Sequence, residues 1–101
     1  EKRRLQDDLG MTNHMLLVNH GGLAVGPTIG DAFMRFTDLQ RACEIQVMLQ
    51  ATGQSATESD QSILDNIKEQ QNLVNIGETG GQKIWPAMLR KAYALDPGFM
   101  D

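Results

Sequence analysis

The chain has 101 residues, of which 41% are hydrophobic and 22% charged, the size and composition of one small globular domain. Nine Lys and Arg against thirteen Asp and Glu give a net charge of -4 without a basic stripe, which argues against nucleic-acid binding. A single cysteine excludes an internal disulfide, and no uncharged run approaches the roughly 20 residues of a membrane span. We therefore expect a cytoplasmic protein with a modest hydrophobic core and no membrane partner.

The start of the chain predicts a short polar helix over residues 1–9. Leu5 and Leu9 share one face of this helix, and Gly10 is a plausible C-terminal stop. The chain does not begin with Met, and no N-cap residue precedes the helix. We therefore expect the chain to begin inside a larger domain.

Residues 15–25 predict a β-hairpin. Residues 15–18 form a continuous apolar run typical of a strand buried on both faces, and residues 23–25 predict a second short strand. Gly21 and Gly22 between them allow the positive φ angles that tight turns need. A strand that is apolar throughout requires neighbours on both sides, and this chain contains too few strands to supply them.

A long amphipathic helix is the clearest element of the sequence. Thr28 and Asp31 form an N-terminal box before a stretch of helical apolar spacing that ends near Gly53. Asp31 and Arg35 belong to the polar face, at a spacing that suits an ion pair. Cys43 lies within this helix among apolar residues, which favours a small buried hydrophobe over a nucleophile.

The C-terminal half predicts two more helices. Residues 60–74 are rich in Gln, Asn and Asp and predict a peripheral helix, and the glycine-containing stretch 75–81 predicts a mobile loop. A last helix is expected to open at Trp85 and Pro86 and to run through Leu95, since Pro suits the first turn of a helix.

Several candidate sites can be weighed from residue type and spacing. The glycines between residues 21 and 28 resemble a phosphate loop, but Pro27 stands where the lysine should be, which excludes nucleotide binding there. His14 and His20 are the only imidazoles, and a zinc site needs three or four ligands. His20 is the better candidate because it follows a buried strand, whereas His14 belongs to a polar connector. Tyr93 is a weaker candidate, as a phenol serving a neighbouring active site.

With these residues in view, the sequence resembles the class II aldolase/adducin family. The resemblance rests on Asn19-His20-Gly21 after a hydrophobic strand, followed by a short strand ending in Gly26 and a helix led by Thr28. Residues 9–50 carry nearly all of it. The stretches Trp85-Pro-Ala-Met-Leu-Arg-Lys and Leu95-Asp-Pro-Gly-Phe-Met-Asp look like the tail of bacterial, enzyme-like members.

The resemblance implies an α/β fold, in which residues 1–101 are the C-terminal part of a three-layer α/β/α domain whose N-terminal half is absent. It implies a divalent metal, usually zinc, with His20 as one ligand and the remaining ligands and the acidic base in the missing half. It leaves the catalytic residues unknown, and this chain alone would be inactive.

The activity implied is that of a metal-dependent aldolase-type lyase acting on small hydroxy-aldehydes, sugar phosphates or related hydroxy acids. Such proteins are typically homotetramers, so we expect a homo-oligomer or association of this chain with the missing half of its domain. The alternative is a non-catalytic, adducin-like binding or scaffold module. An upstream His-x-His pair would favour the enzyme, and its absence would favour the scaffold.

Overall fold

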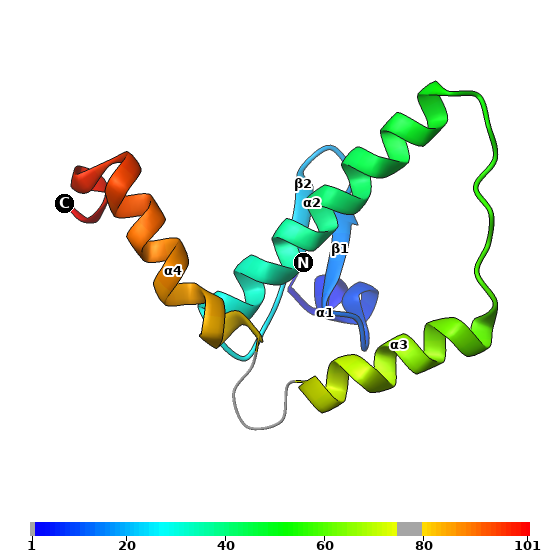
Figure 1. The fold of residues 1–101 in the computed structure, drawn as a ribbon, viewed down its shortest axis with the longest axis horizontal. Coiled ribbons are helices and arrows are strands. Elements are labelled where there is room, and N and C mark those ends of the chain that lie inside the picture. The colour runs from blue at the N-terminus through cyan, green and yellow to red at the C-terminus, as the bar shows by residue number, and fades with distance from the viewer. Residues whose placement is uncertain (1, 75–79) are drawn as a thin grey trace.

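The computed structural model describes residues 2–74 and 80–101, which form a hairpin and a set of helices arranged around one long helix (Figure 1). In chain order the elements are α1 (Lys2–Leu9), β1 (His14–Leu17), β2 (Gly21–Ala24), α2 (Ile29–Ala51), α3 (Gln61–Val74), α4 (Gly80–Leu95) and the 3-10 helix η1 (Pro97–Met100). This mixture confirms the α/β class. Within the described ranges, no helix has the length and apolarity needed to cross a membrane.

The predicted hairpin is present, and each strand begins one or two residues earlier than expected. β1 and β2 pair antiparallel, with Met15 opposite Leu23 and Leu17 opposite Gly21. The expected burial of β1 on both faces is not found: Met15 and Leu17 are half-buried, whereas Leu16 is 65% exposed. The physical reason is that successive side chains of a strand point to opposite faces of the sheet, and α2 packs against the hairpin on one face, which leaves Leu16 on the open face.

Helix α2 confirms the prediction at both ends. Thr28 is its N-cap, and the Thr28 side chain accepts a hydrogen bond from the backbone N–H of Asp31 at 3.1 Å. The helix runs to Ala51, and Gly53 follows with a φ of 69°, a left-handed conformation that glycine adopts without strain.

The predicted start of α4 is wrong. The helix begins at Gly80, so that Pro86 lies inside it rather than in its first turn. Gly80 and Gly81 thus belong to the helix and not to the expected loop, of which residues 75–79 lie outside the described residues. The earlier start follows from a contact with α2: Gly81 packs against Gly30, so the first turn of α4 is held by its neighbour.

The expected modest core is not found in this chain. None of the hydrophobic residues that the structure describes is buried, and the accessible surface is 8739 Å², against about 5,700 Å² for a compact protein of this mass. The radius of gyration is 16.6 Å, where a compact chain of this length has about 13 Å. The elements therefore meet mainly along α2, which contacts the hairpin and α4.

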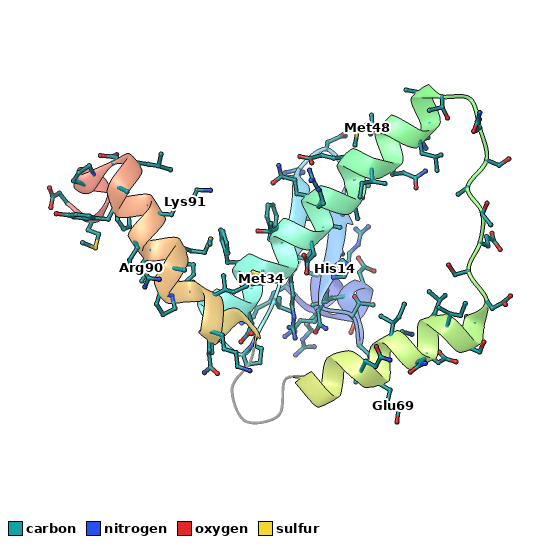
Figure 2. The ribbon with its side chains drawn as sticks, viewed as in Figure 1. His14, Met34, Met48, Glu69, Arg90 and Lys91 are labelled. Carbon is teal, nitrogen blue, oxygen red and sulfur yellow. The ribbon has the colours of Figure 1, made fainter. Side chains whose placement is uncertain are left out.

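Helix α3 is peripheral, as predicted. Its described side chains are exposed, including Ile63 at 51% and Ile67 at 46%. Figure 2 shows Glu69 directed away from α2 and the hairpin.

Candidate functional site

The turn between β1 and β2 carries the Asn-His-Gly motif. The backbone N–H of His20 donates to the carbonyl of Leu17 at 3.2 Å, closing a tight turn. Asn19 has a φ of 59° and Gly21 a φ of 101°. Asn is among the few residues with a side chain that tolerate the left-handed region, and glycine enters it freely. Two of the three motif residues are thus explained by backbone geometry, and His20 between them is not.

His20 lies exposed in this turn, with one ring nitrogen already engaged. Its Nδ1 is 3.0 Å from the carbonyl oxygen of Val18. A carbonyl only accepts, so in the neutral imidazole this contact places the proton on Nδ1 and leaves the Nε2 lone pair available. A metal-bound histidine usually has this arrangement, with the second ring N–H donated to a carbonyl or carboxylate. The imidazole therefore fits the role of a single metal ligand.

The second imidazole, His14, lies apart from the first. It begins β1, opposite Ala24, at the end of the hairpin away from the turn, and it is exposed (Figure 2). Within residues 2–74 and 80–101, no three His, Cys, Asp or Glu side chains come close enough to hold a metal ion. The described chain thus supplies one candidate ligand at the turn, and a complete site needs donors from elsewhere.

The hairpin rests on α2 at two points. Near the turn, a Cβ placed on Gly22 would lie 3.1 Å from Cε2 of Phe36 and 3.2 Å from Cδ2 of Leu39. At the other end, the Arg35 guanidinium donates to the carbonyl of Val25 at 2.6 Å. The expected reason for Gly22, a positive φ, is wrong, because Gly22 is not among the described glycines with a positive φ. What distinguishes the position is its close approach to the helix, where a Cβ would require Phe36 or Leu39 to shift by a few tenths of an ångström.

Asp31 is the one buried charged residue among those described, at 7% exposure, and its predicted place on the polar face is wrong. Its carboxylate accepts from the Thr28 hydroxyl at 2.6 Å and from the backbone N–H of Gly81 at 3.2 Å. The second bond joins residues 50 positions apart and fixes α4 to the first turn of α2. Nothing local in the sequence indicates it, since an N-terminal box looks the same with or without a distant partner.

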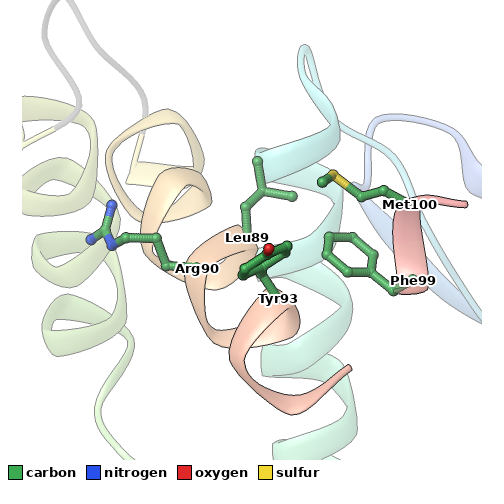
Figure 3. Close-up of a pocket in the computed structure, with 5 residues that line it drawn as sticks. All are labelled: Leu89, Arg90, Tyr93, Phe99 and Met100. Carbon is green, nitrogen blue, oxygen red and sulfur yellow. The ribbon is translucent and has the colours of Figure 1, made fainter. Parts of the chain in front are cut away.

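The structure also places the two weaker candidates, Cys43 and Tyr93. Cys43 is half-buried on α2, so the structure places it partly in contact with the chain and not fully buried as predicted. Tyr93 lies in an apolar groove of about 290 Å³ between α4 and η1, with Leu89, Phe99 and Met100 (Figure 3). Arg90 completes the lining, which contains no carboxylate, thiol or imidazole, so the groove lacks the donors of a metal site or an acid–base pair.

Trp85 does not join the aromatic residues of that groove. It packs edge-on against Phe33 of α2, with ring centroids 5.7 Å apart, and so supports the junction that Asp31 also holds. Trp85 therefore packs α4 onto α2, while Tyr93 remains 54% exposed.

Comparisons with known proteins show which family this sequence is similar to. Residues 1–47 match the family model described as the class II aldolase and adducin N-terminal domain. A Pseudomonas aeruginosa protein described as a "Putative aldolase class 2 protein" is 44% identical over 101 residues, which cover 98% of this chain and 39% of that protein. A Caulobacter vibrioides protein with the same description is 33% identical over 102 residues, with 100% and 39% covered.

A third relative belongs to the other branch of the family. Human beta-adducin is 46% identical over 48 residues, which cover 46% of this chain and 7% of that protein. No solved structure matches the chain significantly. The chain belongs to the class II aldolase and adducin family. It spans about 39% of the length of the two bacterial relatives.

Proposed function

We propose that this chain is the C-terminal part of the domain of a metal-dependent, aldolase-type lyase, and that His20 is one ligand of its divalent metal, by preference zinc. The observation that carries the proposal is the state of the imidazole: Nδ1 faces the carbonyl of Val18 and Nε2 is left available in an exposed turn. Family membership supports the same chemistry, and the coverage of the bacterial relatives leaves room for further ligands.

The role of this chain would be to hold one donor atom in place. When bound, a divalent cation supplies Lewis-acid polarisation of carbonyl and hydroxyl oxygens in the substrate. Asn19 and Gly21 set the backbone of the turn, and the bond to Val18 orients the His20 ring. Small hydroxy-aldehydes, sugar phosphates and related hydroxy acids are the substrate class we propose. The groups that move protons would come from outside these residues.

The rival function is a binding or scaffold module without catalysis. The match to human beta-adducin over 48 residues favours it as the second candidate, because that relative is named as an adducin. A scaffold has no need of a free Nε2, whereas a metal site does. We therefore place the lyase first.

The test uses the complete protein, purified and supplied with zinc or manganese, on a panel of hydroxy-aldehydes and phosphorylated sugars. Retro-aldol cleavage is expected, together with one bound metal ion per subunit. His20→Ala should abolish both while the melting temperature of the metal-free protein stays unchanged, because the side chain is exposed. His14→Ala is the matched control and should keep both.

Two results would decide against the proposal. If the complete protein neither contains metal nor gains thermal stability when metal is added, the scaffold function holds. If metal binding survives in His20→Ala and fails in His14→Ala, the ligand assignment is wrong.

We further propose a cytoplasmic homo-oligomer. Many apolar side chains of the described residues are exposed, among them Val18 at 86%, Ile29 at 73% and Val47 at 64%, and such surface favours association. Sedimentation of the complete protein should show a species larger than one subunit. A monomer at high concentration would contradict this.

A further inference from the structure

We propose that Phe36 is a positioning residue for the His20 imidazole, acting through its contact with Gly22. This inference rests on the proposed role of His20 as a metal ligand. It concerns the residue on α2 that fixes where the motif turn lies above the helix, a residue that does not itself touch the metal.

The contact is close and is made by the aromatic ring of Phe36 together with Leu39, whose Cδ2 would lie 3.2 Å from a Cβ at position 22. Of the three atoms nearest to a Cβ placed on Gly22, two belong to Phe36, with Cε2 at 3.1 Å and Cζ at 3.6 Å. These separations leave no room for a side chain at position 22 unless the ring moves. The missing side chain of Gly22 and the ring of Phe36 are therefore matched in size.

The contact lies two residues from His20 along a stretch with little conformational freedom. The N–H of His20 is bonded to Leu17, and Leu17 is paired with Gly21 across the hairpin. The turn therefore moves with the start of β2 as one unit. The distance between the turn and α2 is set by the contact of Gly22 with Phe36. The other contact, the hydrogen bond from Arg35 to the carbonyl of Val25, lies beyond the far end of β2.

The chain offers a matched control on the same helix. Phe33 is 41% exposed and Phe36 is 43% exposed, so replacement of either removes a similar apolar surface. Phe33 contacts Trp85 of α4, whereas Phe36 contacts Gly22 of the hairpin. A general loss of packing on α2 would affect both variants, and a displaced turn would affect Phe36→Leu alone.

The experiment measures zinc affinity of the complete protein by competition with a chromophoric chelator, with the melting temperature of the metal-free protein as the folding control. Phe36→Leu is expected to weaken zinc binding about tenfold, the effect typical of residues that orient a metal ligand. Phe33→Leu should change it less than about twofold while lowering the melting temperature to a similar extent. The visible spectrum of the cobalt-substituted protein should shift in Phe36→Leu and not in Phe33→Leu.

A compensating variant tests the size match directly. Gly22→Ala alone should weaken zinc binding, because the added methyl displaces the ring. In the Phe36→Leu background the same methyl fills vacated space, so Gly22→Ala/Phe36→Leu should bind zinc more tightly than Phe36→Leu, and the two effects should not add. If either single variant does not fold, the other still tests the contact.

The outcomes separate this inference from the proposed function. If His20→Ala loses zinc while Phe36→Leu and Phe33→Leu bind it equally well, the positioning role is wrong and the ligand assignment stands. If the effects of Gly22→Ala and Phe36→Leu simply add, the contact does not orient His20. If His20→Ala keeps its zinc, the proposed ligand fails and this inference fails with it.

Discussion

The carboxylate of Asp31 accepts a hydrogen bond from the backbone N–H of Gly81, 50 residues further along the chain. The same carboxylate accepts a hydrogen bond from the hydroxyl of Thr28, and Asp31 is 7% exposed. One buried side chain therefore serves the start of α2 and the start of α4. Both helices therefore depend on Asp31 for the position of their first turn.

Asp31→Ala is expected to lower the free energy of unfolding of the complete protein by about 2 kcal/mol, the scale of charge-assisted hydrogen bonds lost in a buried setting. Asp38→Ala, on the exposed side of α2, should change it by less than about 0.5 kcal/mol. Urea denaturation followed by circular dichroism measures both. Equal effects would show that the Asp31 bonds carry no stability.

Gly81→Ala is expected to destabilise the protein by about 1–3 kcal/mol, although alanine usually favours a helix over glycine. A Cβ at this position would collide with the backbone of Gly30 and Asp31. Gly98→Ala is the control, because its Cβ would meet Oδ1 of Asp96 at an ordinary 3.4 Å. Thermal unfolding should separate the two variants. A Gly81→Ala protein as stable as the natural one would mean that α4 does not approach α2 this closely.

Arg35→Met is expected to cost about 1 kcal/mol, since it removes the bond from the guanidinium to the carbonyl of Val25. Arg41→Met should cost less than about 0.5 kcal/mol, because the Arg41 salt bridge with Glu44 is largely exposed. Denaturation at low and at 0.5 M salt provides the measurement. We expect added salt to diminish the small Arg41 effect and to leave most of the Arg35 effect.

Asn19→Ala is expected to cost about 1 kcal/mol, and Asn19→Gly a few tenths at most. The reason is the φ of 59° at this position, which a Cβ disfavours unless the side chain is that of Asn or Asp. Chemical denaturation of both variants gives the comparison. Should Ala and Gly prove equally tolerated, the turn is not held in the left-handed conformation.

Local signals in the sequence predicted the hairpin and α2 well. Thr28 and Asp31 mark a helix start within four residues, and the glycines after His20 mark a turn, so both features are decided by neighbours along the chain. The start of α4 could not be predicted in this way. It depends on the fit of Gly81 against Gly30, a contact that no window of local sequence contains.

The candidate site likewise has some features that local sequence predicts and others that depend on distant contacts. The motif turn and its imidazole were predicted from Asn19-His20-Gly21, because two of these residues report backbone angles directly. The burial of Asp31 and the fit of Phe36 over Gly22 were not, since each depends on a partner brought near by folding. The space beside a glycine is known only when the structure shows which atoms lie there.

Because the Gly81 amide is bonded to Asp31, its protection from exchange also depends on the hairpin that contacts Asp31. Gly26, which leaves the hairpin, has no room for a Cβ because Asp31 and Ala32 lie against it. A displacement of the hairpin exit therefore presses on the residue whose carboxylate holds the Gly81 N–H. Deuterium exchange at Gly81 would read out events at the hairpin without any probe being placed there.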